Sequence, residues 1–286
     1  MSVVARLTAF AAVLALVFGV TLALGSASDV SPQRAAKAAA KTGMSGMADA
    51  GPGAVEAPRG LGVAEGGVRL VADTTTYSRG ETRPFSFRIV DARGTTVRDF
   101  DVEHTKRLHL IAVRRDLTGY QHVHPVQAAD ASWSVPLRFA EAGVYRVYAD
   151  FKAQGAEKTT LATDVFVAGD FQPRALPVPA TRVSVDGYDV ALKGAGRAGA
   201  TGDLEFTVSK GGRPVAVQPY LGADGHLVAL REGDLAYLHV HPQETPGSGG
   251  PIRFMTEYPS AGRYRLFLQF EHGGRIHTAA FSQDVS

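Results

Sequence analysis

The chain has 286 residues, of which 45% are hydrophobic, and is therefore long enough for two domains with separate cores. Thirty Lys and Arg nearly balance 28 Asp and Glu, and no dense basic stripe occurs, which argues against a nucleic-acid partner. The absence of cysteine excludes disulfides, cysteine-ligated zinc, thiolate copper and iron–sulfur sites. Imidazole and carboxylate remain as the strong metal donors.

The N-terminal segment predicts membrane targeting. Residues 7–24 are uncharged and mostly apolar, at the lower length limit for a spanning helix, and small residues follow at 25–27. Residues 1–27 are therefore expected to be a signal peptide or a transmembrane anchor, and the sequence does not separate the two. Basic residues beyond this run weakly oppose export, but large folded domains cross membranes largely regardless of nearby charge. We expect an extracytoplasmic protein, either membrane-anchored by the N-terminal helix or secreted.

Residues 28–62 are rich in Ala, Gly, Ser and Pro and predict a flexible linker. From about residue 66, short apolar or alternating runs are separated by turn-forming clusters, a cadence typical of a β-sandwich. In the first half these runs cover residues 68–72, 85–90, 108–113, 133–137, 144–151 and 160–167. In the second half they cover residues 183–192, 204–208, 226–230, 236–240, 252–256, 264–270 and 277–281.

No segment has the pattern of a long amphipathic helix within these two halves. The predicted fold is all-β, with two tandem immunoglobulin-like β-sandwich domains over residues 63–172 and 176–286. Residues 171–179 contain three prolines and are the expected interdomain linker.

A histidine pattern occurs twice in the chain. Residues 106–125 (KRLHLIAVRRDLTGYQHVHP) return as residues 223–242 (ADGHLVALREGDLAYLHVHP), 117 positions later. The matched histidines are His109, His122 and His124 in the first copy and His226, His239 and His241 in the second. The constant spacing indicates an internal repeat rather than chance.

Strand geometry predicts that each histidine set converges. Alternation places His122 and His124 on one face of a strand. A hairpin centred near residues 116–117 sets His109 opposite His124, within about 5 Å at Cβ. A one-residue shift of register would send His109 to the other face.

Imidazoles without thiolates suit Cu(II), Zn(II) or Ni(II), and copper is favoured by the divalent affinity order. We therefore expect copper or another divalent transition metal at the histidine clusters, and the sequence leaves open whether the two clusters hold separate ions or share one. His104, His272 and His277 are candidate further ligands. Position 272 aligns with Ala153 and position 277 with Lys158. The extra ligands would therefore differ between the copies.

Two other matched pairs have a structural interpretation. Arg114 and Arg231 are expected on the solvent face. Tyr120 and Tyr237 are expected to anchor the hairpins with their rings while the hydroxyls stay in water. A histidine beside such a tyrosine is also often a half-buried packing residue, so the clusters have a reading without metal.

The motif HLIAVRRDL with QHVHP, and its partner HLVALR with LHVHP, resembles exported actinobacterial two-domain proteins of the secreted or heavy-metal-binding type. The domains are also similar to YtkA-like and CopC-like immunoglobulin-type sandwiches. This resemblance implies an exported, non-enzymatic and metal-linked protein. The chain lacks the processed N-terminal histidine and the Met-rich loop of many copper-resistance sandwiches, which argues against a shuttle role.

The sequence thus favours an exported metal-binding protein that buffers or presents a divalent ion and is not an enzyme. Its partners are the metal and, if the N-terminal segment is retained, the membrane; no protein partner can be named. The alternative is a structural or interaction module whose histidine hairpins pack the two sandwiches together. A third reading, a cupin-like metalloenzyme, rests on His239, His241 and His277 and lacks a counterpart in the first copy.

Overall fold

The computed structural model describes residues 58–238, 240–243 and 249–286. The predicted targeting segment and residues 28–57 of the predicted linker lie outside these ranges. The described residues form strands, turns and loops with no α-helix among them, which confirms the all-β class. Across those same ranges, no helix is long and apolar enough to cross a membrane.

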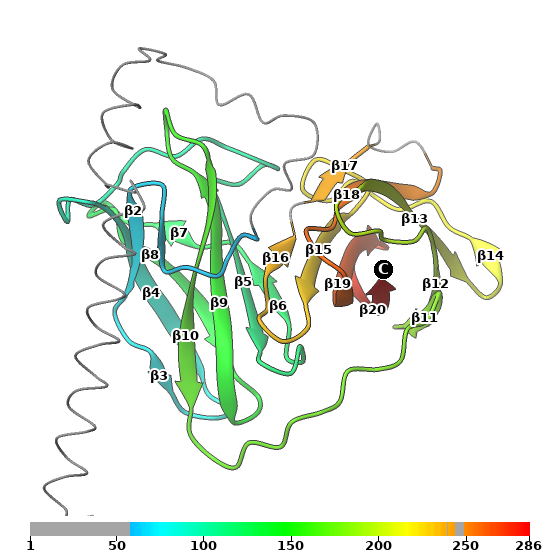
Figure 1. Ribbon diagram of the computed structural model, residues 1–286, viewed down its shortest axis with the longest axis horizontal. Helices are drawn as coiled ribbons and strands as arrows, with labels where there is room; N and C mark the ends of the chain where they lie inside the picture. Colours follow the sequence, from blue (N-terminus) through cyan, green and yellow to red (C-terminus); the bar gives the residue numbers. More distant parts are fainter. Residues whose placement is uncertain (1–57, 239, 244–248) are drawn as a thin grey trace, which may run out of the picture. The chain divides into compact units, whose positions relative to one another are not determined.

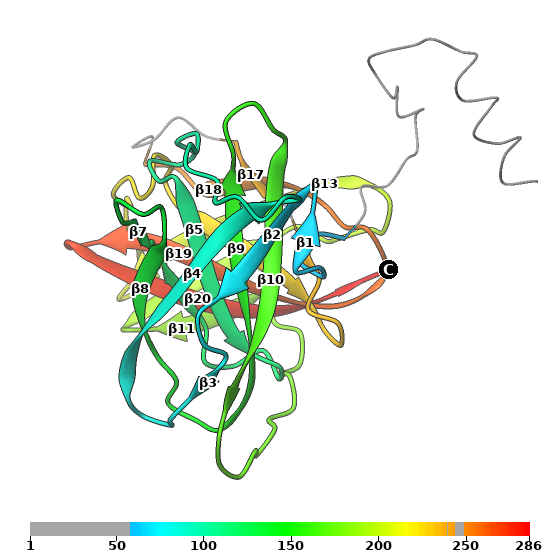
Figure 2. The same cartoon turned by 90° about the vertical axis from the view of Figure 1, so that its left-hand side faces the viewer.

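The first sandwich consists of two five-stranded sheets (Figures 1 and 2). One sheet has the order β1-β2-β4-β8-β7 and the other the order β3-β10-β9-β5-β6. Its strands are β1 (Ala64–Glu65), β2 (Val68–Ala72), β3 (Thr76–Tyr77), β4 (Thr82–Asp91), β5 (Leu108–Arg114), β6 (Gln121–Val123), β7 (Val126–Gln127), β8 (Trp133–Arg138), β9 (Gly143–Lys152) and β10 (Lys158–Val167). All pairings within it are antiparallel except that of β3 with β10.

Alternating side chains of the two sheets fill the space between them. Along β8, Trp133, Val135 and Leu137 are buried while their neighbours are exposed or half-buried. They join Phe85 and Phe87 of β4 in one continuous apolar core. This period-two pattern is the one from which the strands were predicted.

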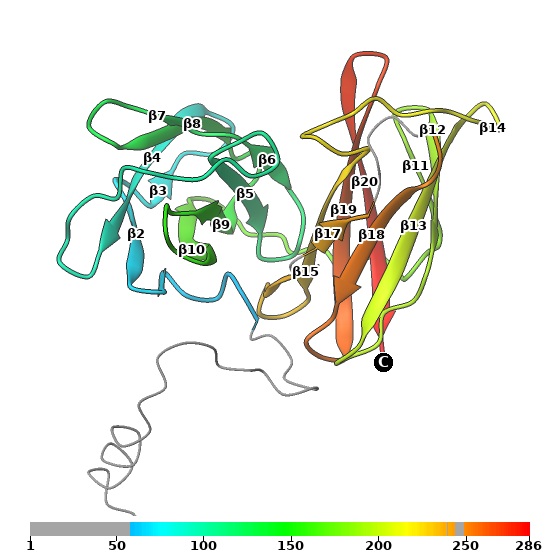
Figure 3. The same ribbon diagram turned by 90° about the horizontal axis from the view of Figure 1, so that it is seen from above.

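The second sandwich has a six-stranded sheet, ordered β11-β12-β13-β18-β17 with β14 beside β13, and a four-stranded sheet, ordered β16-β15-β19-β20. Its strands are β11 (Arg182–Val185), β12 (Tyr188–Lys193), β13 (Thr201–Lys210), β14 (Arg213–Pro214), β15 (His226–Arg231), β16 (Tyr237–Leu238), β17 (Val240–Pro242), β18 (Ile252–Glu257), β19 (Gly262–His272) and β20 (Arg275–Val285). Figure 3 shows β13 and β18 beside the long β19–β20 hairpin. An apolar core again lies between the sheets.

Two predicted strands of the second half are each divided in two. The run 183–192 is a hairpin of β11 and β12, because Asp186 and Gly187 both take positive φ angles, 51° and 80°, as a tight two-residue hairpin turn requires. The run 236–240 is split between β16, which pairs with β15, and β17, which pairs with β18 in the other sheet. The chain therefore changes sheets within the repeated histidine motif.

A matched tyrosine closes a corner in each sandwich. The hydroxyl of Tyr145 donates a hydrogen bond to the Glu141 carbonyl at 3.0 Å, and that of Tyr264 donates to the Ser260 carbonyl at 3.0 Å. A tyrosine hydroxyl bound to backbone a few residues upstream is a hallmark of immunoglobulin-type sandwiches. The chain thus carries this feature twice, at equivalent positions.

The outer face of β5 is covered as completely as its core face. All seven residues of β5 are buried. Leu110 and Ala112 point into the first sandwich, whereas Ile111 and Val113 belong to a separate apolar cluster. Members of that cluster from the second sandwich include Val228, Leu230, Leu235, Tyr237 and Phe267. We call this mixed cluster the junction; both sandwiches belong to one compact unit, Gly53–Ser286.

Candidate functional site

The β5–β6 hairpin has the register predicted from the histidine spacing. Leu110 pairs with Val123 and Ile111 pairs with His122. Continuing this register by one residue sets His109 opposite His124. The three imidazoles of the first copy are therefore directed to one place by backbone pairing alone.

These three rings lie in contact. His109 Nδ1 is 3.1 Å from His122 Nε2. The ring centroids of His109 and His124 are 5.0 Å apart, and those of His122 and His124 are 4.9 Å apart. One ligand nitrogen from each ring can be chosen so that all three lie within 4.8 Å of one another. The first copy therefore presents a three-imidazole group suited to a divalent ion.

A fourth imidazole comes from the second sandwich. The ring of His226 stacks on His122 with centroids 4.6 Å apart and on His109 at 5.4 Å. His104 lies at the edge of the group, 5.9 Å from His226 and 6.2 Å from His109 between centroids. The histidine cluster of the structure is thus His104, His109, His122, His124 and His226.

The contact of His226 with the first copy was not anticipated from the sequence. His226 opens β15, and its outward side meets the first sandwich rather than a hairpin partner. His239 lies outside the described residues, and only the backbone of His241 is described, in β17. The β15–β16 pairing keeps the predicted register up to Leu238, and β17 then pairs with β18 in the other sheet.

His272 and His277 do not join the histidine cluster. His277 pairs with Phe270 across β19 and β20, lies against Tyr188, and has its Nδ1 2.8 Å from an Asp186 carboxylate oxygen. His272 Nδ1 is 2.8 Å from the Tyr188 hydroxyl. Strand alternation explains the difference, because residue 269 faces the cluster and its neighbour Phe270 faces the core. The two candidate further ligands are therefore engaged elsewhere.

A chain of hydrogen bonds runs through the cluster and crosses the junction. The Glu103 carbonyl lies 3.1 Å from His109 Nε2, and His109 Nδ1 faces His122 Nε2. His122 Nδ1 then lies 2.6 Å from Gln269 Oε1 of β19. The Gln269 amide nitrogen donates in turn to the Thr278 hydroxyl at 3.3 Å. Two imidazoles are therefore held between a carbonyl oxygen at one end and an amide oxygen at the other.

Burial keeps these imidazoles neutral. Desolvation, followed by the neighbouring His109, lowers the pKa of His122 to about 3, although the Gln269 hydrogen bond acts in the opposite direction. Desolvation and His109 also lower the pKa of His124 to about 4. The pKa values of His109 and His226 are lowered as well, with desolvation the largest cause in both. Neutral imidazole is the form that binds metal.

Gln269 was not anticipated from the sequence. It pairs with His226 across β15 and β19, as Asp150 pairs with His109 across β5 and β9. Its offset from Asp150 is 269 − 150 = 119, the offset that relates Tyr264 to Tyr145. Aligning the strand after each histidine hairpin could have identified it as the register partner of a histidine.

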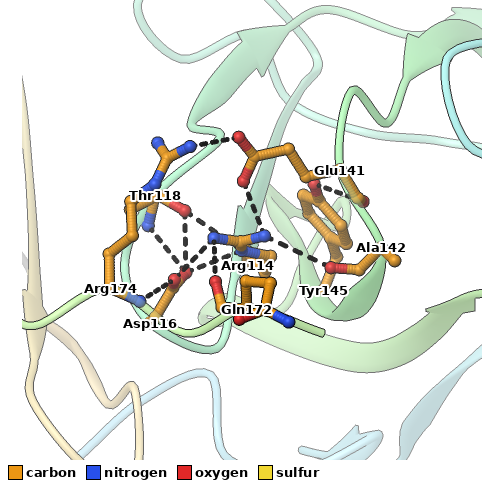
Figure 4. A network of polar contacts seen from close by, with 8 residues as sticks. All are labelled: Arg114, Asp116, Thr118, Glu141, Ala142, Tyr145, Gln172 and Arg174. Atoms are coloured by element: carbon orange, nitrogen blue, oxygen red, sulfur yellow. Dashed lines mark hydrogen bonds and ion pairs between the residues drawn. The ribbon is translucent and has the colours of Figure 1, made fainter. Parts of the chain in front are cut away.

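Arg114 is buried, which corrects the expectation that it faces solvent, whereas its counterpart Arg231 is half-buried and paired with Asp234. Arg114 is 1% exposed, and Figure 4 shows its guanidinium between the carboxylates of Asp116 and Glu141. Arg174 beyond β10 also contacts both carboxylates. Burial would raise the pKa of Asp116, but hydrogen bonds from Arg114 and its neighbours lower it to about 2. Arg114 is buried because its guanidinium neutralises the charge of two carboxylates, and it also donates a hydrogen bond to the Gln172 carbonyl in the interdomain segment.

The expectation for the Tyr120 hydroxyl was also wrong. The ring of Tyr120 stacks on Phe267 with centroids 4.0 Å apart, so the ring does anchor the hairpin. Its hydroxyl is buried and has no hydrogen-bond partner among the described residues. The second sandwich covers the position at which water was expected.

Comparison with known proteins gives one family and several solved structures. A family model described as Domain of unknown function (DUF8832) matches residues 63–168 and again 183–286. The search of curated proteins gives no match.

Among solved structures, the Lin-41 filamin domain is 14% identical, with 37% of this chain and 97% of that chain covered and a TM-score of 0.26. The Escherichia coli adhesin FdeC is 14% identical, with 78% and 65% covered and a TM-score of 0.26. The tandem titin immunoglobulin domains A164–A165 are 15% identical, with 77% and 96% covered and a TM-score of 0.21. This chain thus spans slightly less than two thirds of the adhesin structure.

Proposed function

This chain belongs to the family described as Domain of unknown function (DUF8832), and from that premise we propose that it is a structural and interaction module of two sandwiches held together by their repeated histidine hairpins. The junction is the observation that carries this proposal. It uses matched positions of the two copies, since Ile111 and Val113 correspond to Val228 and Leu230 at the repeat offset.

The junction has the character of a protein core. Ile111, Val113, Val228 and Leu230 are each 0% exposed. Fully burying one aliphatic side chain of this size stabilises a structure by about 1.5–3 kcal/mol. Four such residues therefore supply enough apolar contact to hold two sandwiches together.

Polar contacts fix the orientation of the same surface. The Tyr148 hydroxyl donates to the Leu235 carbonyl at 2.6 Å, and the Tyr237 amide donates to the Arg59 carbonyl at 2.9 Å. Arg146 also donates to the Gly60 carbonyl from two of its nitrogens, at 3.1 and 2.9 Å. Arg59 and Gly60, which lead into the first sandwich, are therefore hydrogen-bonded to residues at the same surface where the second sandwich packs.

The test compares two neighbours on β5 that face opposite ways. Ile111→Ala removes a junction contact, whereas Leu110→Ala removes a core contact of equal burial, and each is expected to cost about 2–5 kcal/mol. Ile111→Ala should separate the unfolding of the two sandwiches and open residues 168–181 to protease, while Leu110→Ala should lower stability without separating them. A single unfolding transition and unchanged proteolysis for Ile111→Ala would refute the proposal that the junction holds the two sandwiches together.

Binding of a divalent metal, with copper favoured, is a second candidate function. The observation behind it is the group of His109, His122 and His124, whose ligand nitrogens lie within 4.8 Å of one another. In this function the protein buffers or presents the ion and performs no catalysis. Titration of metal-free protein with Cu(II) and Zn(II), compared with His122→Ala, tests it, and equal heats for both proteins would end it.

We place the protein outside the cytoplasm, either anchored or secreted, on the strength of the apolar segment 7–24. Cell fractionation of the full chain carrying a C-terminal tag tests this location, and recovery from the cytosol alone would overturn it. The cupin-like reading is not carried further, because His277 is hydrogen-bonded to Asp186 within the second sandwich.

A further inference from the structure

We propose that a single divalent transition-metal ion binds at the junction and is shared by the two sandwiches, with His109 Nδ1, His122 Nε2 and His124 Nε2 as ligands from one and His226 Nε2 from the other. This inference rests on the proposed contact between the sandwiches and adds that a metal ion binds within that contact. It gives one site per chain, a point that the two histidine copies in the sequence left open.

A count of hydrogens carries the first step. The carbonyl of Glu103 needs a donor, so His109 has its hydrogen on Nε2. Gln269 Oε1 also needs a donor, so His122 has its hydrogen on Nδ1. Each neutral imidazole has one N–H, which leaves two lone pairs facing each other across 3.1 Å. With these tautomers, a cation between the two nitrogens would satisfy both lone pairs.

The spacing of these nitrogens fits a metal ion. Imidazole nitrogens bind zinc at about 2.0–2.1 Å. Two of them that are 3.1 Å apart then subtend an angle of roughly 95–100° at the ion. This angle lies between the values for square-planar and tetrahedral neighbours, which covers the geometries that Cu(II) and Zn(II) prefer.

Two further nitrogens in the cluster lack partners. His124 Nε2 and His226 Nε2 are buried and make no hydrogen bond to any described residue. A buried polar atom left unpaired costs about 1–3 kcal/mol. An ion held by His109 and His122 would satisfy the adjacent His124. The ring of His226 stacks on His122 with centroids 4.6 Å apart, and we expect a change of its side-chain rotamer to bring Nε2 to the ion.

The cluster is also accessible from solvent. A pocket beside it is lined by His124, Thr105, Lys106 and Pro125, among other residues. An ion can therefore approach His124 from this pocket without separating the sandwiches, and a usable metal site needs such an entry path.

Gln269 is the positioning residue of this site. As the acceptor for His122 Nδ1–H, it fixes the tautomer that directs the Nε2 lone pair to the ion, which is the usual role of a residue behind a metal-bound histidine. Without metal, the Gln269 amide can turn over and donate to His122 Nδ1, which satisfies the chain of hydrogen bonds by a second route. A glutamate at position 269 offers only acceptor oxygens and so favours the metal-binding tautomer.

The experiment is calorimetric titration of the metal-free full chain with Cu(II) and Zn(II), with circular dichroism to confirm that each variant is folded. We expect one tight ion per chain and loss of that binding in His122→Ala. Gln269→Ala should weaken binding about 10–100-fold, as loss of a residue behind a metal ligand typically does, and Gln269→Glu should restore it. His272→Ala, outside the cluster, should bind as the unchanged protein does.

Three results would overturn the inference: no tight binding, two tight ions per chain, or unchanged affinity in both Gln269→Ala and His226→Ala while His122→Ala loses the ion. The last result would place the ion in the first sandwich alone. Failure of the junction itself is detected separately, since Ile111→Ala tests that contact in metal-free protein.

Discussion

His122 and Gln269 lie 147 positions apart in the chain, and their side chains meet at 2.6 Å across two sandwiches. Each occupies a repeated strand, β6 in one sandwich and β19 in the other. The contact connects a candidate metal ligand to the outer face of the opposite domain. Occupancy of the site and docking of the domains should therefore influence each other.

Metal should raise the stability of the whole unit if the ion is shared. A ligand that binds only the folded state adds about 2.7 kcal/mol at a concentration of 100 times its dissociation constant. Zn(II) should therefore raise the melting temperature of the full chain and protect residues 168–181 from protease. In His226→Ala the melting temperature should rise less. An equal rise in both proteins would assign the ion to the first sandwich.

Metal-free protein should lose stability as the pH falls below neutrality. The folded-state pKa of His122 is about 3 and that of His124 about 4, against about 6.5 in the unfolded chain. Below pH 6.5 the unfolded state therefore binds more protons than the folded state, and the free energy of unfolding decreases as the pH falls. Stability should be full above about pH 6.5 and decline toward pH 4. Urea denaturation at several pH values measures this, with His122→Gln as the variant that should show a shallower decline.

Arg114→Ala should be strongly destabilising. It leaves Asp116 and Glu141 without their shared guanidinium, and removal of one partner from a buried ion pair typically costs about 3–5 kcal/mol. Arg114→Lys should recover only part of this loss, because an ammonium cannot form the paired contacts made by the Arg114 Nε and Nη2 atoms with Asp116. Chemical denaturation measures both. The matched control is Arg115→Ala at the exposed neighbouring position, which should change stability by less than about 0.5 kcal/mol.

Tyr148→Phe should weaken the junction without disturbing either core. The substitution removes one hydroxyl and leaves the buried Leu235 carbonyl without its donor, at a cost of about 1–3 kcal/mol. The loss should come with earlier separation of the two sandwiches in limited proteolysis. Tyr145→Phe offers the contrast, since its hydroxyl bonds within the first sandwich and its loss should not change their separation. Identical proteolysis of the two variants would contradict this assignment.

Gly60→Ala should also be destabilising. Gly60 has a φ of +67°, and a Cβ there would lie 2.8 Å from a ring carbon of Tyr148. An alanine would therefore strain the backbone and displace a tyrosine that contributes to the junction. Gly80→Ala, at a similar φ of +81° with no atom within 4 Å of the added Cβ, separates the backbone effect from the steric one. Thermal unfolding of both variants should show the larger loss for Gly60→Ala.

The sequence was sufficient for the strands and for the first histidine group. Apolar alternation located most strands, and histidine spacing implied the register of the β5–β6 hairpin, because both depend on local geometry. The divided strands were missed although Asp186-Gly187 is a recognised hairpin signal. The apolar run of β5 was itself a sign of burial on both faces, since a half-exposed strand would alternate.

The composition of the site was less predictable, because it depends on which surfaces meet. Nothing local to His226 indicates that its ring contacts His109 and His122 of the first copy. Gln269 has no motif and is recognisable only through its register with Asp150. Arg114 was misjudged because, besides the nearby Asp116, it pairs with Glu141, which lies 27 residues further along the chain. Long-range contacts of this kind are set by tertiary packing, which spacing along the sequence does not encode.

Because β5 is buried on both faces, each half of the protein has an apolar surface that is covered only when the other half is present. A fragment ending near residue 170 would expose Ile111, Val113 and Tyr148 to water as one apolar patch. Since the second half presents the matched positions, two such fragments have a ready way to cover each other. Expression of this first-half fragment alone should therefore yield a homodimer rather than a soluble monomer.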